Sequence, residues 1–219
     1  NLTVSARNIE MSGKSALFGE TRGKGNGGNL MVEVAESLTL QDRAIISTTA
    51  YGEGAAGSIT INSNNIRLEN QARLTAETQA GDKGSITINN NKDLILRNNS
   101  RITTNATDSA TGGNIAIKTE NLVAPDNSDI SANAEKASGG RVNITATGIF
   151  GTEFRPDQTE KSDITATSAL GPQFNGEVKI NTPDVDPSDG LIEFDDTIPD
   201  ISNLPVSYTH LRAHETLPY

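Results

Sequence analysis

The sequence predicts an all-β fold: a right-handed parallel β-helix, or solenoid, with three short strands in each turn. A glycine-led motif recurs at a nearly constant interval, each interval contains three short stretches of alternating apolar residues, and the apolar residues are mostly aliphatic. Alternation with a period of two is typical of strands, and self-similarity at roughly 20–50 residues is typical of repeat architectures. We expect about seven rungs between residues 1 and 181, followed by an irregular exit.

The first strand of each predicted turn follows a glycine. One polar residue comes next, and then two apolar residues separated by a single position, as in Gly57-Ser58-Ile59-Thr60-Ile61. Alternate residues of a strand share a face, so both apolar side chains point into the core. Successive motif glycines are 27 or 29 residues apart until the last interval, which is 36; they are Gly28, Gly57, Gly84, Gly113, Gly140 and Gly176. The core residues expected from the middle strands are Ile59, Ile61, Ile86, Ile88, Ile115 and Ile117.

Two further strands complete each turn. A second apolar pair, such as Ile66 and Leu68, is followed by a third apolar segment whose central residue, here Leu74, lies eight positions after the start of the pair. Strands of successive turns stacked about 4.8 Å apart bury these small apolar faces around one aliphatic column. The chirality of parallel crossovers favours a right-handed coil. From the third strands we expect Leu74, Ile102 and Ile130 in the core.

Asparagine and aspartate recur between the second and third strands. We interpret this column as a structural ladder of turn residues rather than a ligand site, because Asn and Asp tolerate tight-turn conformations and bond to local backbone. A second column after the first strand contains Asn62, Asn89 and Asn181. The loops that precede each motif glycine contain further glycines, which we expect to supply positive φ angles. The ladder residues are Asp42, Asn70, Asn98 and Asp126.

The regular repeat is expected to span residues 1–181, with an insertion at about 148–162 before the last third strand. Phe150 and Phe154 in this insertion are candidates to cover the end of the core. Seven of the eight prolines follow residue 155, and proline cannot donate to a strand ladder. We therefore predict a Pro-rich extended exit or cap at 182–205. Residues 206–219, which carry both histidines, resemble a short non-native tail, and a disordered natural terminus is the alternative.

Composition excludes several functional classes. The net charge of −10 leaves no basic surface for phosphates, so we expect no nucleic-acid partner. No apolar run is long enough to cross a membrane, and we expect no membrane insertion. The chain has no cysteine and therefore no disulfide or thiolate chemistry. Its first residues lack the pattern of a signal peptide, so we expect a piece cut from a longer protein.

The sequence presents no convergent reactive groups, and we predict that the chain is not an enzyme. His210 and His214 lie in the tail without a metalloprotease motif, and Asp184, Asp186 and Asp189 are explained by turns among prolines. We assign no catalytic residue, cofactor or metal. The outward row of the third strands carries small hydroxyls and is expected to be solvated surface; its members are Ser47, Thr75, Thr103, Ser131 and Thr165.

The end of the repeat region resembles filamentous haemagglutinin-like exoproteins, especially the cyanobacterial kind. The resemblance rests on Gly148 to Phe154, on Ser162-Asp163-Ile164-Thr165-Ala166-Thr167, and on Ile180 to Pro187 with Gly190-Leu191, and in style it covers about residues 1–195. It implies a right-handed β-helix passenger of the two-partner secretion type. Such a protein is secreted or displayed on the outer cell surface through an outer-membrane barrel transporter, which recognises an amino-terminal domain that this sequence does not include.

The expected function is a non-enzymatic rod segment of a secreted cell-surface adhesin. The rod would hold adhesive regions away from the cell, with glycans or matrix of a host or neighbouring cell as partners, and weak contacts would sum over many copies. The rival is a polysaccharide lyase or glycosidase, because β-helix enzymes act on polysaccharides through carboxylates on one outward face. A passive scaffold of a biofilm matrix is the third alternative, and it differs from the adhesin in having no receptor.

Overall fold

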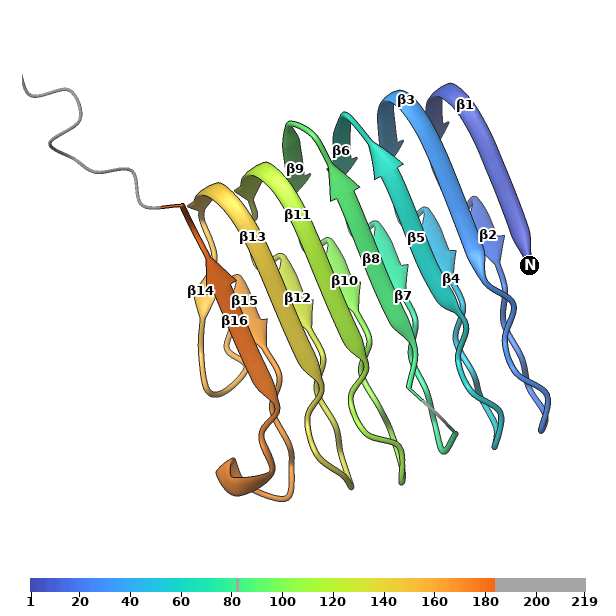
Figure 1. Cartoon of the computed structure of the whole chain (residues 1–219), viewed down its shortest axis with the longest axis vertical. Helices are drawn as coiled ribbons and strands as arrows, with labels where there is room; N and C mark the ends of the chain where they lie inside the picture. The colour runs from blue at the N-terminus through green and yellow to red at the C-terminus, as the bar shows by residue number, and fades with distance from the viewer. Residues whose placement is uncertain (82, 184–219) are drawn as a thin grey trace, which may run out of the picture. The chain divides into compact units, whose positions relative to one another are not determined.

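The described part of the chain forms a parallel β-solenoid with almost no helix. The structure is a computed structural model that describes residues 1–81 and 83–183. Strands of successive turns lie side by side from β1 to β16, and the loops that join one turn to the next extend together at one edge (Figure 1). Every strand pairing is parallel. The predicted fold class is therefore confirmed, whereas the right-handed sense stays a prediction from crossover chirality.

Two sheets build the solenoid. One contains nine strands and holds the first and second segments of each turn, and the other contains seven strands and holds the third segments. The strands of the first sheet are β1 (Leu2–Met11), β3 (Leu30–Leu40), β5 (Ser58–Ser63), β6 (Asn65–Leu68), β8 (Ser85–Asn90), β9 (Asp93–Leu96), β11 (Asn114–Val123), β13 (Arg141–Phe150) and β16 (Glu177–Asn181). Those of the second are β2 (Ala16–Phe18), β4 (Ile45–Ser47), β7 (Arg73–Thr75), β10 (Arg101–Thr103), β12 (Asp129–Ser131), β14 (Glu153–Phe154) and β15 (Asp163–Thr165).

The first strands of successive turns pair in one continuous series along the stack, and β16 is the last described member of that series. The series is β1, β3, β5, β8, β11, β13 and β16. Three separate strands per turn form only in the turns of β5–β7 and β8–β10. Elsewhere the first and second segments run through the bend as one strand. The physical reason is that pairing continues across the bend: β1 pairs with β3 on both sides of it, with only a register shift between Ala6 and Asn8.

The core is a column of aliphatic side chains stacked in register. Ile59, Ile86 and Ile115 pair from turn to turn in the first strands, and Leu74, Ile102 and Ile130 do so in the third. All nine core residues expected from the sequence are buried, and the most exposed of them, Ile117, is 3% exposed. Each turn therefore buries its apolar face against its two neighbours and not within itself.

The predicted ladder residues hold the turn between the second and third segments. Asp42, Asn70, Asn98 and Asp126 have φ angles of 55°, 54°, 53° and 62°, and the residue after each of them is also left-handed. Side-chain amides bridge the turns: Asn70 Nδ2 donates to Asp42 Oδ1 at 3.0 Å, and Asn98 Nδ2 donates to Asn70 Oδ1 at 2.9 Å. A left-handed conformation and a short amide side chain suit Asn and Asp better than other L-residues.

The motif glycines close each loop. The backbone N–H of Gly113 donates to the carbonyl of Thr104 at 2.7 Å, and Gly28, Gly57, Gly140 and Gly176 make the corresponding bond in their own turns. We call this crossing the neck, because it joins the outgoing and returning legs of a loop. A Cβ on Gly113 would lie 2.4 Å from the carbonyl oxygen of Gly84 in the previous turn. Glycine is needed here for close backbone approach.

The prediction that the loop glycines supply positive φ is wrong. Gly52, Gly54, Gly81 and Gly112 are not in the left-handed region, and only Gly13, Gly151 and Gly171 are so among the described glycines. A Cβ on Gly54 would lie 2.0 Å from the carbonyl oxygen of Gly25 in the preceding turn. The glycines occur because the loops also stack, as the parallel bridges between Thr21, Ala50, Thr78, Ala106, Ala134 and Ser168 show.

The insertion adds a strand to the end of the second sheet. Its β14 pairs with β15 as the outermost strand, and the chain then returns through residues 155–162. Phe150 and Phe154, which were expected to cover the end of the core, are 55% and 52% exposed instead. Ile149 and Val178, both partly buried, pack on the core at this end. Of the predicted exit only residues 182 and 183 are described; the rest of it and the 206–219 tail lie outside the described residues.

Candidate functional site

The outward side of the second sheet forms a polar groove. The hydroxyl row expected as solvated surface does face outward, but it is buried, with exposures of at most 7%. The reason is that the side chains two residues before and two residues after each hydroxyl, most of them longer, flank the row on both sides and cover it. Two adjoining hollows of about 160 and 470 Å³ occupy the space, and both are lined by Glu77, Asn105 and Gln158. We call this feature the second-sheet groove.

Three parallel rows define the groove. Residues two positions before each hydroxyl form the charged row, and those two positions after form the amide row. The charged row is Ile45, Arg73, Arg101, Asp129 and Asp163. The hydroxyl row is Ser47, Thr75, Thr103, Ser131 and Thr165. The amide row is Thr49, Glu77, Asn105, Asn133 and Thr167.

Glu77 is the central carboxylate of the groove. Its Oε1 accepts a hydrogen bond from the Thr103 hydroxyl at 2.7 Å, and no described residue donates to its Oε2. Burial raises the pKa of the Glu77 carboxyl above its usual range, while the Thr103 hydrogen bond and the charges of Arg73 and Arg101 oppose that rise. The second oxygen of Glu77, which lines the groove, is therefore an acceptor without a partner in the part of the chain that the structure describes.

Asp129 is the second carboxylate that lines the groove. It is 1% exposed, and it accepts from the backbone N–H of Asp163 at 3.1 Å while Arg101 Nε lies 3.6 Å from its Oδ2. Burial raises the pKa of Asp129, and the Asp163 N–H and the Arg101 charge oppose the rise. Glu77 and Asp129 line the same 160 Å³ hollow.

The insertion closes one end of the groove. Arg155 pairs with the fully buried Asp163 and with Glu153, and the backbone N–H of Thr159 also donates to Asp163. Gln158 Nε2 reaches Asp129 Oδ2 at 3.5 Å. The insertion that lengthens the last repeat in the sequence thus forms one wall of the groove, through Asp157 and Gln158.

The opposite end carries an exposed aromatic ring. Tyr51 is 50% exposed, its hydroxyl donates to Glu20 Oε1 at 3.5 Å, and the Arg22 guanidinium lies 5.7 Å from its ring centroid. Glu20 also accepts from the Ser47 hydroxyl at 2.7 Å, which ties this end to the hydroxyl row. Burial, followed by the charges of Glu20 and Glu77, raises the pKa of Tyr51.

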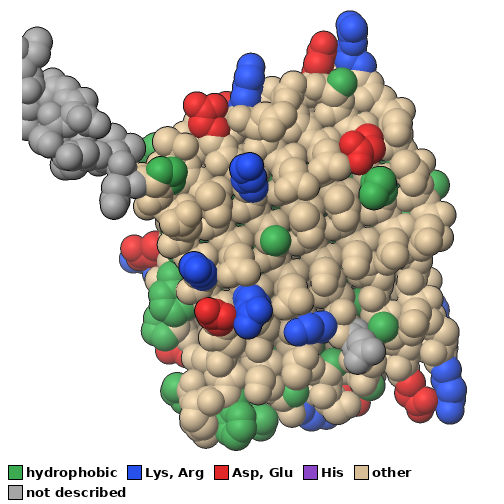
Figure 2. All heavy atoms as spheres, in the orientation of Figure 1, with side chains coloured by type: hydrophobic (Ala, Val, Ile, Leu, Met, Phe, Trp, Pro, Cys, Tyr) green, Lys and Arg blue, Asp and Glu red, His purple; other side chains and the backbone are tan. Residues whose placement is uncertain are grey.

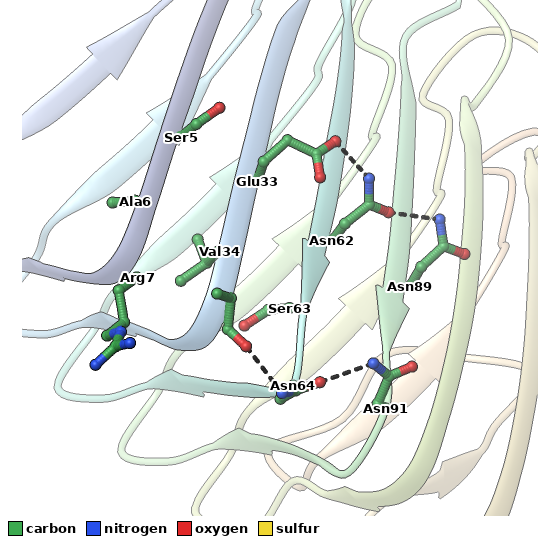
Figure 3. Close-up of a pocket in the computed structure, with 11 residues that line it drawn as sticks. Ser5, Ala6, Arg7, Glu33, Val34, Asn62, Ser63, Asn64, Asn89 and Asn91 are labelled. Atoms are coloured by element: carbon green, nitrogen blue, oxygen red, sulfur yellow. Dashed lines mark hydrogen bonds between the residues drawn. The ribbon is translucent and has the colours of Figure 1, made fainter.

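A larger hollow of about 770 Å³ lies on the first sheet, where β3, β5 and β8 bend (Figure 3). Its amides are bonded to one another: Asn62 Nδ2 donates to Glu33 Oε1 at 2.7 Å, and Asn89 Nδ2 donates to Asn62 Oδ1 at 2.8 Å (Figure 3). Asn91 Nδ2 donates to Asn64 Oδ1 at 2.7 Å. These ladders use their polar atoms to tie turns together, so this hollow is structural. Asn181, the third member of the predicted column, pairs with Thr145 farther along.

The face of the first sheet that Figure 2 shows carries no strong charge pattern. On the face over β3, β5, β8 and β11, Lys, Arg, Asp and Glu side chains are scattered, and neither sign gathers (Figure 2). Across residues 1–81 and 83–183, no three His, Cys, Asp or Glu side chains come together as a metal site. His210, His214, Asp184, Asp186 and Asp189 lie outside the described residues. None of the helices that the structure describes has the length and apolar character needed to traverse a bilayer.

Sequence reasoning did not single out the two carboxylates of the groove. Glu77 belongs to the outward row two residues after the hydroxyls, which was interpreted as solvated surface, and Asp129 lies two residues before the hydroxyls in a row that was not considered. Both carboxylates lie two positions along the chain from a hydroxyl residue, and alternate residues of a strand share a face. That spacing could have placed them on the outward face. No protein family, curated protein sequence or solved structure matches this chain.

Proposed function

We propose that this chain is a non-catalytic rod segment of a secreted, cell-surface adhesin of the filamentous haemagglutinin-like type. The observation that carries the proposal is the uninterrupted aliphatic column, in which each turn is hydrogen-bonded to the next in register from β1 to β16. A stack of this kind resists bending and presents the same surface groups once per turn. Those properties suit a spacer with many weak contacts along its length.

The export route and location belong to the same proposal. A dedicated outer-membrane transporter moves the parent protein to the outer cell surface, and glycans or matrix of a host or neighbouring cell are its partners. The support is the resemblance of Gly148–Phe154 and Ile180–Pro187 to the end of the repeat region in such exoproteins. Fractionation of the producing cell with an antibody to this segment tests the location, and a cytoplasmic pool alone would contradict it.

Attachment by the purified chain tests the adhesive role. The protein is immobilised on beads, and retention of cells and of extracellular matrix is measured. We expect retention by the wild type and its loss with Ile88→Asp, because a charge in the fully buried column unfolds the stack. Beads coated with Glu120→Gln, a change on an exposed strand position, serve as the matched control. Wild-type beads that retain nothing would favour the passive scaffold of a biofilm matrix.

A polysaccharide lyase or glycosidase is the second candidate, and one observation favours it. Glu77 and Asp129 line one narrow hollow, and burial raises the pKa of both. Glycoside hydrolysis uses two carboxyl groups of which one stays protonated near neutral pH. Incubation with a polysaccharide panel, followed by reducing-end assay, separates the candidates. We expect no turnover; activity that disappears in both Glu77→Gln and Asp129→Asn would replace the rod proposal by the enzyme.

A further inference from the structure

The second-sheet groove contains polar atoms that no described residue engages. Glu77 Oε2 is an acceptor without a donor among the described residues. Asn105 and Asn133 each use Oδ1 to accept a backbone N–H of the next turn at 2.8 Å, which leaves their Nδ2 groups without an acceptor among the described residues. In the first-sheet hollow of Figure 3, the amides of Asn62, Asn89 and Asn91 instead donate to oxygens of the preceding turn and form ladders.

One hydroxyl of the row is buried outside the two hollows. Thr165 follows Ser131 in the hydroxyl row and is 0% exposed, and its Oγ1 has no hydrogen-bond partner within the described part of the chain. An unsatisfied buried hydroxyl destabilises the fold, and a buried water molecule would satisfy it. The polar atoms that a ligand can reach are therefore those of the residues that line the two hollows.

We propose that the second-sheet groove binds a neutral, linear polysaccharide along the rod axis; this inference rests on the proposed adhesive function and assigns its ligand site. Sugar hydroxyls both donate and accept, and the groove offers the free acceptor of Glu77, the free amide donors of Asn105 and Asn133, and the guanidinium of Arg73. Polar groups that recur once per turn fit a polymer of repeating polyhydroxylated units. The half-exposed Tyr51 ring provides a stacking surface at one end.

The charges and the backbone disfavour other polymers. Glu77, Asp129 and Asp157 would repel a polyanion, and Arg101 is already paired with Asp129 at 3.6 Å. A peptide that added itself as a strand would need an unpaired sheet edge. The strands that floor the groove, from β4 to β15, are each paired on both sides. A neutral chain is therefore the occupant that the groove favours.

Affinity electrophoresis through gels that contain a neutral glucan, mannan or galactan tests the site. We expect retardation of the wild-type chain by at least one of them, with about 10-fold weaker binding in Glu77→Gln, because that change removes a charge-assisted acceptor while keeping the side-chain shape. Tyr51→Ala, at a half-exposed loop residue, should also weaken binding without unfolding the protein. Glu120→Gln is the matched control outside the groove and should bind as the wild type does.

Several results would overturn the assignment. Binding that neither Glu77→Gln nor Tyr51→Ala weakens would place the polysaccharide elsewhere on the rod, and stronger retardation by a polyuronate than by every neutral gel would reverse the ligand class. Absence of retardation in all neutral gels would also overturn it. The rod proposal is tested separately, by bead attachment and by the turnover assay. If the protein attaches to cells but no neutral gel retards it, only the assignment of the groove is wrong.

Discussion

Replacement of Gly113 by alanine tests whether the motif glycines are needed for close approach between turns. The new Cβ would lie 2.4 Å from the Gly84 carbonyl oxygen and 2.6 Å from Thr104 Cβ, which for the oxygen is about 1 Å inside an ordinary contact. The main obstacle is backbone that is itself bonded in the stack, so two turns must separate locally. Overpacking of this size costs about 1–3 kcal/mol, or about 2–12 °C in Tm for a chain of this length.

Gly23→Ala is the matched control for this prediction. Gly23 lies in a loop beyond its neck, outside the left-handed region, with nothing within 4 Å of an added Cβ. There alanine should leave stability unchanged or raise it by up to about 1 kcal/mol through the unfolded state. Urea unfolding followed by far-UV circular dichroism compares the three proteins. If Gly113→Ala and Gly23→Ala unfold at the same urea concentration, the account of the neck is wrong.

Three further predictions concern the core, the ladder and the groove. Ile88→Ala should lower the free energy of unfolding by about 2–5 kcal/mol, and a loss no larger than that of an exposed control would refute the register of the column. Asn70→Ala and Asn70→Gly both lose the ladder hydrogen bonds, but only alanine is strained at a φ of 54°, so the alanine variant should be about 1 kcal/mol less stable than the glycine variant; equal urea midpoints of the two would contradict this. The raised pKa of Glu77 means that wild-type stability falls as pH rises through that pKa. In Glu77→Gln, the urea midpoint should therefore lose the part of its decrease with rising pH that Glu77 causes in the wild type. Below the ordinary pKa of glutamate the variant should be no more stable than the wild type. If the midpoints of both proteins decrease equally with pH, the effect of burial on Glu77 is refuted.

The stack could be predicted because its signal is periodic. Ile59, Ile86 and Ile115 recur at the same place in each unit, and a parallel stack is the arrangement that buries such small apolar faces together. The division into two sheets was not predictable, because a strand that bends has the same alternating pattern as two strands. The role of the glycines was misjudged for a related reason. Positive φ and close approach both demand glycine, and a single sequence does not distinguish them.

The groove was harder to predict than the core. Ser131 and Thr103 were correctly placed on the outward face, but their burial depends on how far the flanking rows and the insertion rise above them. Arg155 joins the insertion to β15, which follows it in the chain, and Gln158 joins it to β12, which precedes it; the positions of both side chains depend on a loop without periodicity. Repetition in the sequence predicts the core and turn positions that all turns share. The chemistry of the groove depends on residues that occur in one turn only, such as Glu77 and Gln158.

The necks have a consequence for how such a chain tolerates variation. Each one clamps the base of a loop with a backbone hydrogen bond, so the segment beyond it can change length without disturbing the column. The spacing of the motif glycines varies between turns while the stacked isoleucines keep their register. The architecture therefore accommodates insertions and deletions at one edge, whereas the close approach of Gly54 and Gly81 to the preceding turns limits which residues these loops can carry.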